Sequence, residues 1–444
     1  MKSIKNYLYI SAGLLLLASC KPTVETPALT AGTADFSRYI SVGNSLTAGY
    51  ADGGLYLEGQ LNSYPSIIAK QMAQVGGGAF TQPLFTTDQA NGSGYVKLTG
   101  FTATGSPITA PVTTNLAVRG TATIPGFGTV ILYTKYSGEI NNYGVPGIKL
   151  QQITYAPYGN LNGYYERMLA GNAGTNTTAY IDFVTAKPFT FFTDWLGNND
   201  ALGYATSGGA ADALTPKDQF AGLYNLSIGK LTAGGAKGAV ATIPDVTSVP
   251  YFTTVTVGAI LAGVQKANPS VAALYINARS SADIATTTYA PRAATAADLV
   301  VLTFPTTKIG QPVAVPGVGN VPYGLTPYAP IENQYVLDAN EITLTKDYVD
   351  DYNKTIKASA ASKGLAVFDA FTFLNNLKAN GMVIDGVSVN SNFISGGIFS
   401  LDGVHLTPRG YAIVANEFIK AINKQYGSSI PKANVSAYNG VKFP

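Results

Sequence analysis

The stretch Phe36-Ser-Arg-Tyr-Ile-Ser-Val42 continues without a break into Gly43-Asn-Ser45-Leu-Thr-Ala-Gly-Tyr50. Its first half has the apolar and β-branched character of a buried strand. Gly43 has no side chain, so the chain can turn sharply there and present Ser45 at the carboxyl end of the strand. In open α/β sheets, that edge is where functional sites form. The Ser45 backbone N–H would also be free to donate to a developing oxyanion. Taken alone, however, a Gly-Asn-Ser turn is more often only a turn.

Further apolar runs along the chain alternate with helical patterns. Strands are predicted at residues 187–196, 238–243 and 365–369, and helices at residues 64–75, 216–232, 345–362, 370–380 and 408–423. Thr345 is the expected cap of its helix, and Pro408 suits the first position of the last one. Strands alternating with helices predict a three-layer α/β/α sandwich around a mainly parallel sheet.

Length and composition suit one enlarged domain or two. The chain has 444 residues, of which 46% are hydrophobic and 12% charged. The net charge of +3 comes with no basic cluster, which argues against nucleic acid as a partner. Two regions, at about 76–138 and 284–333, are rich in Gly, Pro, Thr or Tyr and are predicted to be β-rich or loop insertions in a domain spanning 36–444. A monomer is the expected state.

The first twenty residues have the pattern of a targeting segment. Lys2 and Lys5 precede an apolar run that ends in Leu17-Ala-Ser-Cys20. This ending resembles the lipobox of a bacterial lipoprotein, which implies cleavage before Cys20 and a lipid on its thiol; the alternative is an ordinary signal peptide. Residues 21–35 then read as a flexible tether. The expected location is the bacterial cell envelope, at the outer membrane or cell surface, with the membrane as partner through Cys20.

One short stretch near the other end holds the only histidine in the chain. It reads Leu401-Asp402-Gly-Val-His405-Leu-Thr-Pro-Arg-Gly-Tyr411. Any chemistry that uses an imidazole base must therefore use His405. Asp402 lies three positions earlier, where a loop can turn its carboxylate onto one ring nitrogen and leave the other nitrogen free to take a proton. With a single cysteine and a single histidine, no zinc site of the Cys/His type can form.

Two other segments could supply hydrogen-bond donors. Asn142-Tyr-Gly-Val-Pro-Gly147 offers glycine N–H groups that a ligand can approach closely. The strand at 187–196 ends in Gly197-Asn-Asn199-Asp200, and an asparagine at the carboxyl end of a strand can aim its amide at a substrate oxyanion. Each could also be a plain turn, and Gly144 and Gly147 both fit the first role.

The order of these motifs resembles that of the SGNH superfamily of hydrolases, also called GDSL esterases and lipases. The four sequence blocks and the core strand order carry the resemblance, over about half of the chain after Cys20. It implies a flavodoxin-like sheet, Ser45 as nucleophile, His405 as base and Asp402 as the residue that orients it. It also implies that Ser45, Gly147 and Asn199 donate to the oxyanion. The family's usual Gly-Asp-Ser-Leu reads Gly-Asn44-Ser-Leu here, at a position that is not the nucleophile.

The expected activity is hydrolysis of carboxylic esters through an acyl-enzyme, with no metal and no organic cofactor. The Tyr-rich insertions suit acetyl esters on glycans, whereas the membrane tether suits acyl esters of lipids, and both substrates remain open. The alternative from a different class is a lipid-anchored binding protein that keeps the fold but is catalytically weak. The retention of Ser45, Asn199, Asp402 and His405 together favours the enzyme.

Overall fold

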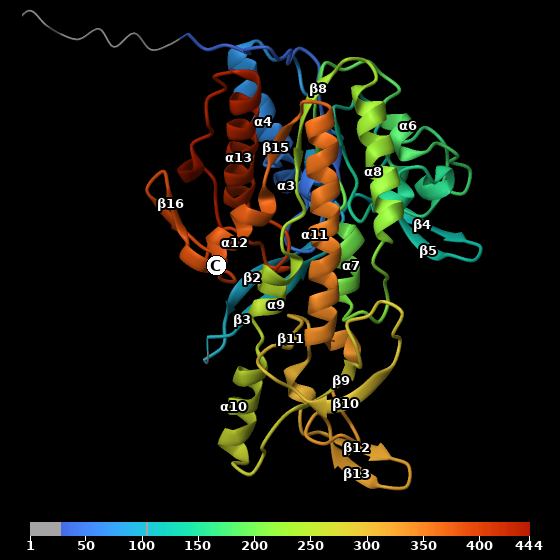
Figure 1. The fold of residues 1–444 in the computed structure, drawn as a ribbon, viewed down its shortest axis with the longest axis vertical. Helices are drawn as coiled ribbons and strands as arrows, with labels where there is room; N and C mark the ends of the chain where they lie inside the picture. The colour runs from blue at the N-terminus through green and yellow to red at the C-terminus, as the bar shows by residue number, and fades with distance from the viewer. Residues whose placement is uncertain (1–27, 104) are drawn as a thin grey trace, which may run out of the picture.

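A computed structural model describes residues 28–103 and 105–444. The predicted signal segment and Cys20 lie outside these residues, as does the first part of the tether. At the centre is a five-stranded sheet in the order β15 (Ala366–Phe368), β8 (Lys237–Ala241), β7 (Phe191–Trp195), β1 (Tyr39–Gly43) and β6 (Asn142–Gly144) (Figure 1). All neighbouring strands in this sheet are parallel. The predicted α/β fold with a mainly parallel sheet is confirmed.

Two of the central strands, β1 and β7, form where the sequence is mainly apolar. Every residue of β1 and β7 is buried, because helices cover both faces of the sheet. The three-residue strand β6 was not expected, since its Asn-Tyr-Gly sequence carries no strand pattern. It forms because Ser41, Val42 and Gly43 of β1 pair with its backbone.

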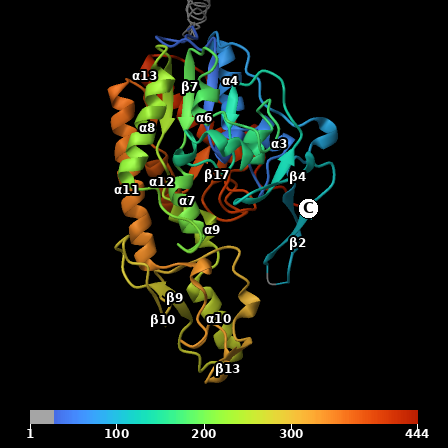
Figure 2. The ribbon, with the colours of Figure 1, turned by 90° about the vertical axis from the view of Figure 1, so that its right-hand side faces the viewer.

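Two helix pairs make the outer layers. On one face α4 (Tyr64–Met72) packs against α13 (Pro408–Tyr426), and on the other α8 (Lys217–Thr232) packs against α11 (Ala339–Ser362). Figures 1 and 2 show α8 and α11 side by side along the sheet. Smaller helices complete the layers, namely α2 (Ser45–Ala48), α3 (Leu57–Leu61), α5 (Gly163–Glu166), α6 (Tyr180–Val184), α7 (Asn199–Thr206) and α12 (Ala370–Asn380).

The capping residues explain where the last two long helices begin. Thr407 caps α13 by accepting from the N–H of Gly410, with Pro408 at the first position as expected. The expectation that Thr345 caps its helix is wrong. The side chain of Asp338 accepts from the N–H groups of Asn340 and Glu341, so α11 starts at Ala339.

Two groups of small elements decorate this core. The first contains two hairpins, β2 (Tyr95–Phe101) with β3 (Pro107–Val112) and β4 (Val118–Ile124) with β5 (Gly128–Tyr133). The second forms a lobe at the lower end of α11 in Figure 1. It contains α9 (Pro250–Thr253), α10 (Val257–Ala267), β9 (Tyr275–Arg279), β10 (Tyr289–Ala293), β11 (Leu299–Val300), β12 (Pro312–Val315), β13 (Gly319–Pro322) and β14 (Val336–Leu337).

One more hairpin, β16 (Met382–Ile384) with β17 (Val387–Val389), precedes the loop that carries His405. In the part of the chain that the structure describes, no helix has both the length and the apolar character needed to cross a bilayer.

Candidate active site

The residues singled out in the sequence follow three adjacent strands. Ser45 comes after β1, Gly147 after β6 and Asn199 after β7, and these strands are neighbours in the sheet. Because the strands are parallel, their carboxyl ends lie at one edge. The sheet therefore brings Ser45, Gly147 and Asn199 to the same end of the molecule.

A tight turn presents Ser45 at the start of α2. Gly43 has φ +156°, and a Cβ there would lie 2.0 Å from the Thr47 hydroxyl oxygen, so the turn requires glycine. Asn44 caps α2, with its Oδ1 accepting from the N–H of Leu46 at 3.0 Å. Ser45 is the first residue of this short helix, so its backbone N–H has no acceptor within the helix.

A continuous line of hydrogen bonds joins Ser45, His405 and Asp402. The Ser45 Oγ lies 2.8 Å from His405 Nε2, and His405 Nδ1 lies 2.9 Å from Asp402 Oδ2. An ionised carboxylate can only accept a hydrogen bond, so Nδ1 carries the ring hydrogen and Nε2 accepts from the serine hydroxyl. This arrangement allows the imidazole to take the serine proton during attack on a carbonyl carbon.

The Asp402 carboxylate is held in its charged form. Its Oδ1 accepts from the N–H groups of Val404 and His405 at 2.9 and 2.8 Å, and Oδ2 accepts from the N–H of Gly53 at 2.9 Å. Burial by itself would raise the pKa of Asp402, but the charge of His405 and these hydrogen bonds hold that pKa well below its usual range. The partner of His405 is therefore an anion at neutral pH.

A second carboxylate, Asp52, holds the loop that carries Asp402. Its Oδ1 accepts from the N–H of Leu401 at 2.9 Å, and its own N–H donates to the Ser400 hydroxyl oxygen at 2.9 Å. The Tyr56 hydroxyl donates to its Oδ2 at 2.7 Å. Asp52 has φ +53°, a left-handed conformation that few residues other than glycine adopt. Sequence analysis missed this residue, and its Asp-Gly pair signals only a turn.

The two candidate glycines differ in whether their N–H groups are occupied. The N–H of Gly144 donates to Asn142 Oδ1 at 3.0 Å, and a Cβ at Gly144 would lie 2.3 Å from the N of Ala48. Gly147 lies in an exposed turn with φ +85°, and its N–H makes no hydrogen bond to any residue that the structure describes. Of the two, Gly147 has the N–H that a ligand could use.

Asn199 is the first residue of α7, directly after the turn that ends β7. Its Nδ2 donates to the backbone oxygen of Ile148 at 2.9 Å, which sets the amide beside the Gly147 turn. One of the two amide hydrogens remains for another acceptor. The neighbouring Asn198 is buried, and neither polar atom of its side chain has a partner among the described residues.

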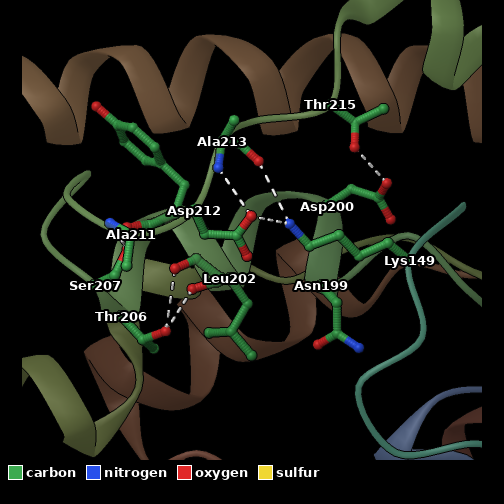
Figure 3. A network of polar contacts seen from close by, with 12 residues as sticks. Lys149, Asn199, Asp200, Leu202, Thr206, Ser207, Ala211, Asp212, Ala213 and Thr215 are labelled. Carbon is green, nitrogen blue, oxygen red and sulfur yellow. Dashed lines mark hydrogen bonds and ion pairs between the residues drawn. The ribbon is translucent and has the colours of Figure 1, made fainter. Parts of the chain in front are cut away.

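The segment after Gly147 is anchored to α7 and to the loop that follows it, and Figure 3 shows the part of this network around Lys149, Asp200 and Asp212. The Asp200 carboxylate accepts from the N–H of Leu150 at 3.0 Å and from the Thr215 hydroxyl at 2.6 Å, while Lys149 pairs with Asp212 at 2.5 Å. Burial raises the pKa of Asp200 to about 6. In the same view the Asn199 side chain points away from this network. Asn199 and Asp200 thus both tie the start of α7 to the segment that follows Gly147. This role of Asp200 was not predicted from the sequence.

Both decorating groups contact the residues around His405. The ring of Tyr50 lies 4.6 Å from the imidazole, and Tyr50 packs edge-on against Tyr164, which stacks on Tyr133 of the β4–β5 hairpin. On the other side, the N–H of Tyr251 in α9 donates to the backbone oxygen of Gly403 at 2.9 Å. The β4–β5 hairpin therefore reaches His405 through the rings of Tyr164 and Tyr50, and α9 contacts the loop between Asp402 and His405 directly.

Comparison with known proteins gives structural similarity alone. No family model and no curated protein matches this sequence. Among solved structures, LAE5, an alpha/beta hydrolase enzyme from the metagenome of Lake Arreo, Spain, is 10% identical with a TM-score of 0.35, over 88% of this chain and 96% of that one. The lipase/acylhydrolase from Enterococcus faecalis is 10% identical with a TM-score of 0.33, over 89% of this chain and 100% of that one. Both TM-scores are low, so the fold class rests on the strand order and helix packing described above.

Proposed function

We propose that this protein is a serine esterase of the SGNH hydrolase type, which cleaves carboxylic esters through an acyl-enzyme. The observation that carries the proposal is the contact between Ser45 Oγ and His405 Nε2 at 2.8 Å, with Asp402 on the other ring nitrogen at 2.9 Å. Ser45 and His405 are 360 positions apart, and the hydrogen-bonded order of hydroxyl, imidazole and carboxylate is that of a serine hydrolase.

In the first half of the reaction, His405 Nε2 takes the Ser45 proton as Ser45 Oγ attacks the ester carbonyl carbon. The tetrahedral oxyanion that results accepts hydrogen bonds from the N–H groups of Ser45 and Gly147 and from Asn199 Nδ2. Each donor stabilises this state by roughly 3–4 kcal/mol, judged from other oxyanion holes. The protonated imidazole then gives its proton to the leaving alcohol as the C–O bond breaks, which leaves Ser45 acylated.

In the second half, water replaces the alcohol. His405 Nε2 takes a proton from the water, which attacks the acyl-enzyme carbonyl, and the same donors hold the second oxyanion. The proton returns to Ser45 Oγ as the acid leaves. Asp402 stays ionised throughout and stabilises the imidazolium that forms in each half.

The test is hydrolysis of p-nitrophenyl acetate, butyrate and octanoate by the full-length chain and by Ser45→Ala. We expect turnover to be lost in Ser45→Ala and retained in Ser66→Ala, the matched control, because Ser66 is equally buried but lies in α4 away from the site. A fluorophosphonate should add its mass to the peptide containing Ser45. Equal turnover by Ser45→Ala, or no turnover on any ester, would refute the esterase.

We also propose a lipid anchor on Cys20 that holds the enzyme at the bacterial envelope. The support is the Leu17-Ala-Ser-Cys20 sequence at the end of an apolar run. Metabolic labelling with an alkyne fatty acid should mark the protein in cells, and Cys20→Ser should abolish the label. Labelling that survives Cys20→Ser would contradict the anchor without affecting the proposal for Ser45.

A further inference from the structure

An apolar cavity of about 60 Å³ lies beside the carboxyl ends of β7, β8 and β15. Its walls come from the turn after β1, from α12, from the loop that carries His405 and from the start of α13. All lining residues are apolar; they include Leu46, Trp195, Pro244, Ala370, Phe373 and Val404. The one polar side-chain atom among them, Nε1 of Trp195, donates to the backbone oxygen of Thr242 at 3.1 Å. The cavity therefore offers a ligand no polar side-chain group.

The walls of this cavity flank the two reacting side chains. Leu46 directly follows Ser45 in the chain, and Val404 and Leu406 stand on either side of His405. Ser45 and His405 do not themselves line the cavity, but each is bonded in the chain to a residue that does, and their side chains meet at 2.8 Å. The side chains of Leu46, Pro244, Phe373 and Val404 are only partly buried, so the cavity opens to the surface between them.

The lining selects an alkyl chain as occupant. A sugar in this cavity would lose water from its hydroxyl groups and find no side chain to replace it, which is costly. An alkyl chain would lose no hydrogen bonds and would gain from removing its surface from water. Close-packed protein interiors contain few voids larger than one water molecule, so an open apolar space at this position is unusual.

We propose that this cavity binds the acyl chain of the ester and restricts the substrate to short acyl groups of roughly two to four carbons. The inference rests on the proposed esterase function. A cavity of roughly 150 Å³ is known to hold benzene, with six carbons. The cavity beside Ser45 has about 60 Å³, less than half of that volume. Two of its lining residues lie on α12, the partly buried Phe373 and, at the start of the helix, Ala370.

The experiment measures kcat/KM of the full-length chain on p-nitrophenyl acetate, butyrate, hexanoate and octanoate. The kcat/KM of the wild type should be at least tenfold lower for octanoate than for butyrate. Phe373→Ala should raise the octanoate-to-butyrate ratio about tenfold or more, because a methylene in an apolar pocket changes discrimination by roughly 10- to 200-fold. Ala370→Leu should lower the butyrate-to-acetate ratio about tenfold by filling the cavity. Phe371→Ala is the matched control, since Phe371 is partly buried on the same helix but does not line the cavity.

Two results would overturn the acyl pocket. One is Ser45-dependent turnover in which Phe373→Ala and Ala370→Leu keep the wild-type ratios or change no more than Phe371→Ala. The other is a Phe373→Ala variant that changes discrimination between ethyl, butyl and hexyl acetate but not between acyl chains, since the cavity would then hold the alcohol. Turnover that survives Ser45→Ala is a different outcome, because it removes the serine mechanism and this inference with it. Ala370→Leu keeps the test decisive if Phe373→Ala does not fold.

Discussion

The backbone N–H of Gly53 donates to Asp402 Oδ2 at 2.9 Å, the same oxygen that lies against His405 Nδ1. These residues are 349 positions apart. The bond gives the oxygen that faces the imidazole a second hydrogen-bond partner, and Asp52 holds the same loop through Leu401 and Ser400. The turn that follows α2 therefore sets the position of the loop that carries His405.

Asp52 is expected to act as a positioning residue. Asp52→Ala loses the acceptor for the Leu401 N–H and places alanine at φ +53°, so we expect about a 10- to 100-fold loss in kcat and a loss of roughly 1–3 kcal/mol in unfolding free energy. Asp52→Asn retains an acceptor oxygen and tolerates this conformation, so it should recover most of kcat. Steady-state kinetics and chemical denaturation of both variants test this. Equal losses in both variants would mean that the Asp52 charge matters and its positioning role does not.

Asp402→Asn should reduce kcat by about 10³- to 10⁴-fold at pH 8, because an amide favours the wrong imidazole tautomer.

The low pKa of Asp402 also affects stability. A carboxylate whose pKa is depressed on folding adds stability that is complete above its unfolded pKa of about 3.9 and is lost as pH falls towards its folded value.

Chemical denaturation between pH 3 and 6 measures this second effect. The unfolding free energy of the wild type should fall more steeply below pH 5 than that of Asp402→Asn. Parallel pH curves for the two proteins would contradict the depressed pKa, whatever the effect on kcat.

Asn198 and Asn199 are adjacent in the chain but have different expected roles. Asn199 is the proposed oxyanion donor, and Asn198 is its buried neighbour. Asn199→Ala should lower kcat by about 10²- to 10³-fold with little change in KM, because it removes a hydrogen bond made only to the transition state. Asn198→Ala should lower kcat much less, since the Asn198 side chain is buried and Asn199 Nδ2 is the amide beside the Gly147 turn. Steady-state kinetics of both variants, with thermal unfolding to check folding, decides between them. A larger kcat loss in Asn198→Ala would reverse the assignment.

Asn44 stands where the proposed SGNH family usually has an aspartate, and the structure gives a reason to expect little effect of that difference on kcat. Its Oδ1 caps α2 at the N–H of Leu46, a bond that an aspartate oxygen would also make, while its Nδ2 has no partner among the described residues. We expect kcat of Asn44→Asp to stay within about tenfold of the wild type. Asn44→Ala removes the cap and should cost about 1 kcal/mol of unfolding free energy. Denaturation and ester hydrolysis test both, and a fully active Asn44→Ala would show that the cap is dispensable.

The strands and long helices could be predicted because their signals are local. A run such as Phe191–Trp195 is apolar at every position but two, and Pro408 with Thr407 marks the start of α13 directly. The alternation of these elements was enough to predict the parallel α/β sheet. The start of α11 was misplaced because Thr345 and Asp338 can both cap a helix, and only packing and hydrogen bonding choose between them.

The sequence alone also identified which side chains have useful chemistry, since there is one histidine and an aspartate three positions before it. It contained no information about Gly53 and Asp52, because a backbone N–H carries no sequence pattern and the contact spans most of the chain. The same holds for the apolar cavity, whose lining residues come from separate turns and helices and read individually as ordinary core. Tertiary structure alone decided which apolar side chains leave space beside Ser45, because that depends on how the helices pack and not on the hydrophobicity of any one segment.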